Sequence, residues 1–307
     1  MKKTILVTGG AGFVGSHLVD ALVARGDRII VVDKVYPKDT NRNVQAEYIK
    51  MNIQDDGVYE IFNTYKPELL FHLAAHLHDR VSIADPIANA EDNVLGFLNV
   101  CEANRKTSRA KIVFMSSCAV YGVQNQVLIS ETAIPEPRTP YGITKRVGEH
   151  YLQFYQNIEN IPFVAFRAGN IYGPRQDSSA ESGVVGIFSA RCLEGEPVIL
   201  NNDGRTTRDY VYISDVVAAL LKAGDTDVNG VFNIGTGIET QTNQILRLVE
   251  EAVGIKAEVK QNENQQDVLK QIALNVSLAK EALGWEAQVA LKEGIKKTVA
   301  WYRGQKI

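Results

Sequence analysis

Cysteine is scarce in this sequence, and long apolar runs are missing. The three cysteines among 307 residues, Cys101, Cys118 and Cys192, lie far apart and form no C-x-x-C pair. This argues against a disulfide framework and against a structural zinc site. No apolar stretch approaches the about 18 residues that a membrane-spanning helix needs. We therefore expect no metal site, no membrane span and a location in the reducing cytoplasm.

The chain also has no large excess of positive or negative side chains. The chain has 33 Lys and Arg against 36 Asp and Glu, a formal net charge of −3. A balance this close to neutral provides no broad positive field for nucleic acid or for an anionic membrane surface. The length suits two domains, or one large α/β unit with an elaboration.

Short β-branched runs alternate with helix-period segments through the first half of the chain. This alternation predicts parallel strands joined by helical crossovers, an α/β fold with a doubly wound parallel sheet. The near-continuous apolar character of the strands suits a sheet that is covered on both faces. The expected strands are 4–8, 28–33, 69–73, 111–115 and 163–167, and the expected helices are 12–25, 57–65, 86–105 and 140–158.

A glycine-rich motif follows the first expected strand. Residues 10–15, GAGFVG, satisfy G-x-G-x-x-G and open the first expected helix. Glycines there permit a tight turn and the close approach of a pyrophosphate, whose charge would meet free N–H groups and the positive end of the helix. Asp33, at the end of the second strand, would accept hydrogen bonds from an adenosine ribose and repel a 2′-phosphate. The motif therefore predicts a Rossmann-type domain that binds NAD rather than NADP.

The sequence changes in texture after Gly169, where a polar loop and shorter, mixed elements begin. We expect residues 1–168 to form the NAD-binding Rossmann domain and residues 169–307 a smaller, mixed α/β substrate region. Segments 210–213 and 231–234 have strand character, so part of 210–240 is expected to return to the first sheet.

A second motif combines Ser117, at the end of a strand, with Tyr141 and Lys145. Thr139 and Pro140 fit the N-cap and first position of a helix, which puts Tyr141 and Lys145 on one helical face. A phenol with a pKa of about 10 is a poor base at neutral pH, but a nearby ammonium and a cationic nicotinamide would both favour the phenolate. Taken alone, Tyr-x-x-x-Lys is common and favours a surface helix with a snorkelling lysine.

Taken together, these motifs resemble those of the extended short-chain dehydrogenase/reductases, in particular NAD-dependent nucleotide-sugar epimerases of the UDP-glucose 4-epimerase type. The resemblance covers essentially the whole chain. It is carried by residues 8–15, 72–75, 93–94, 116–122, 141–145, 167–176, 207–211, 233–235 and 283–285.

The resemblance implies a role for individual residues. Cofactor contacts are implied for Gly9, Gly12, Phe13, Val14, Asp33, Asn52, Ile53, Leu73, Ala74, Ala75, Tyr141 and Lys145. Catalysis is implied for Ser117, Tyr141 and Lys145, and substrate binding for Ser117, Asn170, Val184 and Arg208. Arg208 is chemically suited to a bidentate phosphate contact.

The implied reaction is epimerisation at C4 of a nucleotide-diphosphate hexose, of the UDP-glucose/UDP-galactose type, through a transient 4-keto intermediate. The implied assembly is a homodimer that pairs helices 86–105 and 140–158. The open alternatives are a nucleotide-sugar 4-ketoreductase, a UDP-glucuronate decarboxylase or epimerase, and a dinucleotide-binding scaffold without chemistry. A scaffold would have no physical need for Ser117, Tyr141 and Lys145 together.

Two departures from the family pattern bear on the substrate. Asn264 stands where the family usually carries a second diphosphate-binding arginine, so the nucleotide is left open. Cys118 and Ala119 stand where the related 4,6-dehydratases need an Asp-Glu pair, which disfavours dehydration. The sequence also leaves open whether the sugar is a plain hexose, an N-acetylhexosamine or a uronate.

Overall fold

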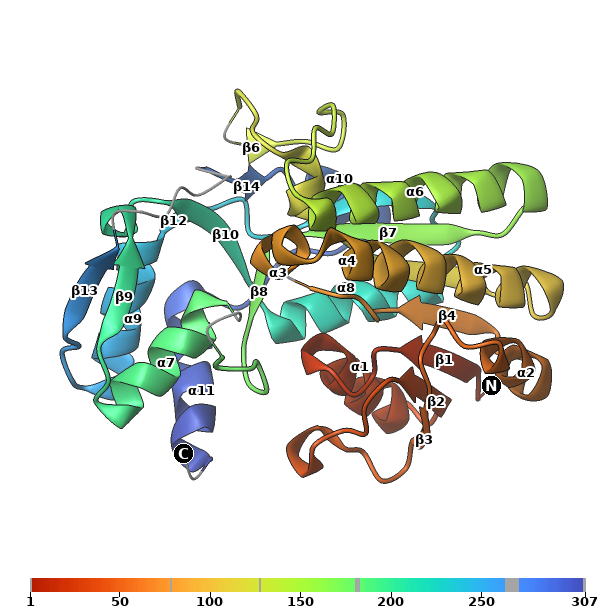
Figure 1. The fold of residues 1–307 in the computed structure, drawn as a ribbon, viewed down its shortest axis with the longest axis horizontal. Helices are drawn as coiled ribbons and strands as arrows, with labels where there is room; N and C mark the ends of the chain where they lie inside the picture. Colours follow the sequence, from red (N-terminus) through yellow and green to blue (C-terminus); the bar gives the residue numbers. More distant parts are fainter. Residues whose placement is uncertain (1, 78, 127, 180–182, 263–270, 306–307) are drawn as a thin grey trace.

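A seven-stranded, fully parallel sheet forms the centre of the protein (Figure 1). The computed structural model describes residues 2–77, 79–126, 128–179, 183–262 and 271–305. The strand order is β11-β7-β5-β4-β1-β2-β3, which confirms the predicted doubly wound α/β fold. The strands are β1 (Thr4–Thr8), β2 (Arg28–Asp33), β3 (Glu47–Lys50), β4 (Leu69–His72), β5 (Lys111–Ser117), β7 (Phe163–Ala168) and β11 (Gly230–Ile234).

Alternation of side chains along the strands separates two hydrophobic cores. Ile5 and Val7 of β1 face one core, and Leu6 between them faces the other. Each core is closed by its own helices, so the sheet is covered on both faces, as its apolar strands predict. One core includes α1 (Phe13–Ala24) and α8 (Ile213–Asp225), and the other includes α2 (Gly57–Tyr65), α5 (Phe97–Lys106) and α6 (Pro140–Glu159).

The helix expected over 86–105 is interrupted. It consists of α4 (Pro86–Ala90), a π-helical segment over Glu91–Gly96 and then α5, and the short helix α3 (Asp79–Ala84) precedes it. The π segment contains the buried Asn93, whose amide donates to the His76 carbonyl and to Thr144 Oγ1, each at 3.1 Å. The π segment therefore joins the loop after β4 to α6, a tertiary contact that helical periodicity does not report.

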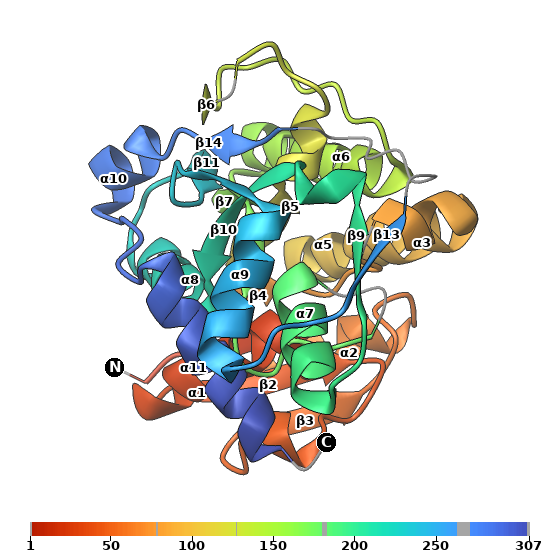
Figure 2. The same ribbon diagram turned by 90° about the vertical axis from the view of Figure 1, so that its left-hand side faces the viewer.

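The rest of the chain builds a second, smaller region beside the sheet (Figures 1 and 2). β11 is the strand of the 210–240 stretch that joins the seven-stranded sheet, whereas β10 pairs with β8 and β12. The helices α7, α9 and α11 pack against one another at the far side. The elements of this region are β8 (Asn170–Tyr172), α7 (Val184–Glu194), β9 (Val198–Asn201), β10 (Thr207–Tyr212), β12 (Glu239–Gln241), α9 (Thr242–Val253), β13 (Val259–Asn262) and α11 (Leu291–Gly304), with β6 (Leu128–Ile129), β14 (Ala273–Leu274) and α10 (Ser277–Leu283) above the sheet.

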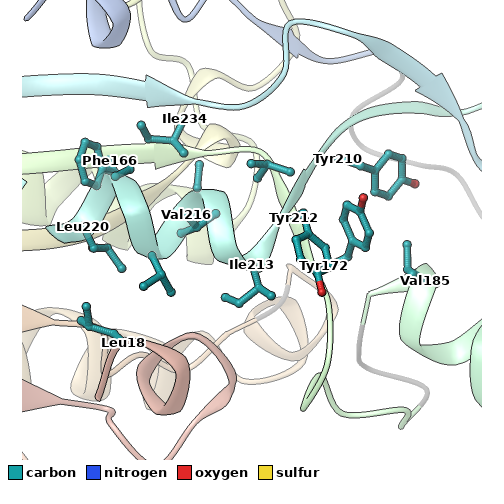
Figure 3. Packing of buried hydrophobic residues seen from close by; sticks show 14 of the residues in the cluster. Leu18, Phe166, Tyr172, Val185, Tyr210, Tyr212, Ile213, Val216, Leu220 and Ile234 are labelled. Carbon is teal, nitrogen blue, oxygen red and sulfur yellow. The ribbon is translucent and has the colours of Figure 1, made fainter. Parts of the chain in front are cut away.

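The two parts share one hydrophobic core. Figure 3 shows the side chains of Phe166 and Ile234 in the large sheet, followed by α8 and then by the tyrosines of β8 and β10. The rings of Tyr172 and Tyr212 meet edge to face with centroids 5.4 Å apart. Because this core continues from one part into the other, it fixes the position of the second region relative to the sheet.

Asp209 fixes the loops above this core. Its buried carboxylate accepts hydrogen bonds from the backbone N–H of Thr236 (2.7 Å), Gly237 (2.9 Å) and Leu274 (3.1 Å). These bonds tie β10 to the turn after β11 and to β14, and they hold the position of the neighbouring Arg208. Among the described residues, no helix is both long and apolar enough to cross a membrane.

Candidate functional site

A cleft of about 590 Å³ runs along the carboxyl ends of the central strands and into the second region. It opens where the strand order reverses between β1 and β4, which is where ligands bind in open α/β sheets. All site residues predicted from the sequence line this cleft, except Lys145. The predicted residues that line the cleft are Gly9, Gly12, Phe13, Val14, Asp33, Asn52, Ile53, Leu73, Ala74, Ala75, Ser117, Tyr141, Asn170, Val184 and Arg208.

The glycine turn has the space and the free donors that a pyrophosphate needs. Gly9 has a φ of +75°, and a Cβ there would lie 2.5 Å from the Ala74 nitrogen, so only glycine fits between the ends of β1 and β4. Gly12 is the N-cap of α1 and provides no side-chain cap, and the first turn has no acidic residue. The N–H groups of that turn are therefore available to an anion at the edge of the cleft.

Asp33 has a structural contact that the sequence did not predict. Its Oδ2 accepts from the Ala11 N–H at 3.0 Å, and its Oδ1 accepts from the Val35 N–H at 3.2 Å. Burial raises the pKa of this carboxyl, and the two backbone bonds oppose the shift. A carboxylate has about four lone-pair sites, so Asp33 can hold the glycine turn and still accept hydrogen bonds from a ribose.

The start of α6 and the end of β5 bring Tyr141 and Ser117 together. Thr139 is the N-cap, accepting from the Gly142 N–H at 3.2 Å, and Pro140 opens the helix, which confirms the predicted start. The Ser117 Oγ accepts from the Ala119 N–H at 3.1 Å. Burial raises the pKa of Tyr141 above its ordinary range, and a hydrogen bond with Ser117 lowers it. The phenol is therefore protonated in the free protein at neutral pH.

Lys145 lies behind the wall of the cleft, 2% exposed. Its Nζ donates to the Met115 carbonyl at 2.8 Å and lies 5.8 Å from the centre of the Tyr141 ring. Burial lowers the pKa of Lys145 to about 7, and the charge of Glu149 raises it. Besides burial, Ser117, Asp79 and Cys118 act on the pKa of the phenol. That the ammonium favours the phenolate stays a prediction.

A buried ion pair under the cleft was not predicted. Glu149 accepts from Arg167 at 2.9 and 2.7 Å, from Ser116 Oγ at 2.7 Å and from Arg146 at 2.8 Å. Burial raises the pKa of Glu149, but these donors outweigh it and hold the pKa below its usual range. The pair fastens α6 to β5 and β7. The spacing of 141, 145 and 149 on one helical face is the sequence signal that could have identified it.

Several residues at the far end of the cleft also escaped the sequence analysis, because they come from separate elements that meet only in the folded chain. Arg208 donates to the Thr207 carbonyl at 2.7 Å. The side-chain oxygens of Gln176 and Asn201 are buried without a partner in the described structure, so they can accept from a ligand. Asn264 lies outside the described residues. Over the whole cleft, lining residues to which the sequence analysis gave no role include Asp79, Ile171, Gln176, Phe188, Ile199, Asn201, Thr206, Tyr210, Thr242 and Ile272.

Other candidate reactive groups near the cleft are inert. Burial lowers the pKa of His72 to about 3, so its imidazole is neutral, and it shares a 2.9 Å hydrogen bond with Thr8. Burial raises the pKa of Cys118 to about 12, which leaves the thiol protonated. Within the described ranges, no cluster of three or more His, Cys, Asp or Glu side chains could hold a metal. Of the two predicted catalytic residues that line the cleft, Ser117 and Tyr141, the phenol is the candidate for proton transfer.

Known proteins of similar sequence and structure share this fold over its full length. The profile of the NAD dependent epimerase/dehydratase family matches residues 5–235. The UDP-glucose 4-epimerase of Mycolicibacterium smegmatis is 38% identical, with 98% of each chain covered. The UDP-glucose 4-epimerase of Thermotoga maritima, solved with UDP-glucose, is 41% identical, covers 98% of each chain and has a TM-score of 0.95.

A third relative handles an acidic sugar. The UDP-glucuronic acid 4-epimerase of Bacillus cereus, solved with UDP-glucuronic acid and NAD, is 27% identical, covers 98% of this chain and 99% of its own, and has a TM-score of 0.90. The family of the matched profile is NAD-dependent, and the glycine turn leaves the space that a dinucleotide needs, so both indicate NAD as the cofactor. The chain belongs to the NAD-dependent epimerase/dehydratase family.

Proposed function

We propose that the protein interconverts the C4 epimers of a nucleotide-diphosphate hexose, of the UDP-glucose/UDP-galactose type, through a transient 4-keto sugar. The observation that carries this proposal is that Ser117 and Tyr141 line one continuous cleft together with the glycine turn and Arg208. One end of that cleft is the glycine turn, and the other contains Asn170, Val184 and Arg208. A sugar between the two ends would lie against the phenol.

Residues 1–168 would hold the dinucleotide, and residues 169–307 the nucleotide sugar. Gly9, Gly12, Phe13 and Val14 would bind the pyrophosphate through the turn and the first N–H groups of α1. Asp33 would accept from the adenosine ribose, and Asn52 and Ile53 would flank the adenine. Leu73, Ala74, Ala75 and Lys145 would complete the nicotinamide end.

In the proposed reaction, Tyr141 acts as the phenolate, after its own proton has left to solvent: it would take the proton from the sugar 4-hydroxyl and return it when the ketone is reduced again, while Ser117 orients that hydroxyl. NAD, when bound, would supply the acceptor for the hydride of C4 and the donor for its return, so no net oxidation would occur. Arg208 and Asn170 would anchor the diphosphate while the keto sugar turns over and presents its other face. The reaction therefore requires a firmly held nucleotide, which keeps the substrate bound, and a loosely held sugar, which can turn over.

We also propose that two copies pair through α4, α5 and α6, which lie side by side in Figure 1. The outer face of α6 carries an apolar stripe in which Ile143, Phe154 and Ile158 are 48%, 48% and 65% exposed. Beside it, Ile87 and Leu95 are 72% and 59% exposed. Apolar side chains gathered on adjacent helices favour a two-fold contact with a second copy. The three buried, free cysteines suit a cytoplasmic location.

The reaction class is tested by supplying UDP-galactose to the purified protein without added NAD or NADH. We expect UDP-glucose to form over many turnovers, because epimerisation regenerates its own oxidant; chromatography of the nucleotide sugars measures it. Turnover only with supplied NADH would identify a ketoreductase instead. Release of CO₂ from UDP-glucuronate, with UDP-galactose inert, would identify a decarboxylase.

Replacing Tyr141 by Phe removes the proposed base and keeps the ring. We expect Tyr141→Phe to lower kcat for UDP-galactose by about 10²- to 10⁴-fold, with NAD content unchanged by mass spectrometry. Tyr59→Phe is the control, since Tyr59 lies on α2 and is 41% exposed. Near-normal turnover by Tyr141→Phe would show that another group takes the proton.

Charge on the apolar stripe tests the dimer. We expect sedimentation velocity to show a dimer for the wild type and a monomer for Phe154→Lys, because a buried lysine at the contact would be left unpaired. Val44→Lys is the control: Val44 is 85% exposed and lies on a loop away from these helices. A wild type that sediments as a monomer would refute the pairing.

A further inference from the structure

Asp79 is a carboxylate in the part of the cleft where the sugar would lie. It is the first residue of α3, and it lines the cleft with Ser117, Cys118 and Tyr141. We call the surface formed by these four residues the sugar end. The Thr139 hydroxyl donates to Asp79 Oδ1 at 2.5 Å, and Thr139 caps the helix that carries Tyr141. The position of the carboxylate is therefore fixed relative to the proposed base.

The charge of Asp79 affects the pKa values of neighbouring groups. Burial is the main reason for the raised pKa of both Tyr141 and Cys118. Ser117 lowers the pKa of Tyr141 and the charge of Arg208 lowers that of Cys118, while the charge of Asp79 raises both. A negative charge that disfavours a phenolate and a thiolate would also disfavour a carboxylate on the sugar. For two unit charges within about 6 Å of each other, at an effective dielectric constant of about 20, such repulsion exceeds a tenfold effect.

In the described part of the cleft lining, each cation has another partner, found or proposed. Among the side chains that the structure describes, Arg208 and Lys34 are the cations of the lining. Lys34 pairs with Asp92 at 3.1 Å beside the cofactor end. Arg208 faces the position proposed for the diphosphate, which itself carries two negative charges. A uronate would add a third negative charge next to Asp79, with no cation of the described lining left for it.

We infer that Asp79 is a specificity-determining residue that excludes acidic sugars, so that the substrate is a nucleotide-diphosphate hexose with an uncharged ring. This inference rests on the proposed function. It also distinguishes sugars that the family resemblance leaves open, because the fold and the cleft are common to relatives named for neutral and for acidic sugars. Asp79 acts here through charge, and its hydrogen bond with Thr139 only places that charge.

The test compares UDP-galactose with UDP-galacturonate as substrates of the NAD-bound enzyme, as the ratio of their kcat/KM values. The variant Asp79→Asn keeps an oxygen that can accept from Thr139 and removes the charge. We expect it to raise the uronate-to-hexose ratio at least about tenfold over the wild type. Asp79→Glu, which keeps the charge, should keep the low ratio. The control Asp92→Asn removes a carboxylate from the cofactor end and should also leave the ratio low.

An unchanged ratio in Asp79→Asn would overturn the inference, as would a wild type that uses both sugars equally well. If Asp79→Asn fails to fold, the wild type decides: screening by salt should raise its uronate-to-hexose ratio, and a ratio independent of ionic strength would refute the filter. Calorimetric binding of UDP-glucose and UDP-glucuronate separates the two proposals. A wild type that prefers UDP-glucose yet turns over no substrate contradicts the proposed function and upholds the filter.

Discussion

The proposed chemistry depends on a tyrosine hydroxyl, that of Tyr141, which would have to lose a proton in a place where burial opposes the resulting charge. Ser117 lowers the cost with one hydrogen bond, while Asp79 and Cys118 increase it. Lys145 is turned toward the Met115 carbonyl. The free protein therefore keeps Tyr141 protonated. In the proposed reaction, a bound nicotinamide would supply positive charge that favours the phenolate, so proton removal would be coupled to occupancy of the cofactor end.

Helix α6 organises the site because it presents different groups at successive turns. Its cap, Thr139, holds Asp79; Tyr141 faces the cleft; and Glu149 forms the buried ion pair with Arg167. The π segment adds a further anchor through Asn93 and Thr144. These contacts reach α3, the strands and the loop after β4, so the proposed base is held from several sides at once. A site of this kind would keep its geometry while the sugar of the proposed reaction turns.

The sequence predicted the parts of this structure that depend on local pattern. β1, β2 and α2 have the predicted bounds, and the Thr139 cap lies where expected. The strand β3 was missed because its exposed, mixed residues resemble a loop, and the π segment was missed because periodicity cannot show an inserted residue. Asp79 and Thr139, and Glu149 and Arg167, are separated along the chain and meet only through packing. Placement of the glycine turn, Ser117 and Tyr141 in one cleft agrees with the sequence, while their roles stay predictions.

The central claim is that one hydride leaves C4 and returns to it inside a closed site. It is tested most directly with UDP-galactose carrying deuterium at C4, incubated with the purified protein in ordinary water. The account predicts that NMR of the UDP-glucose product shows deuterium still at C4. Replacement of that deuterium by hydrogen would contradict the account, because the hydrogen at C4 would then have come from outside the site.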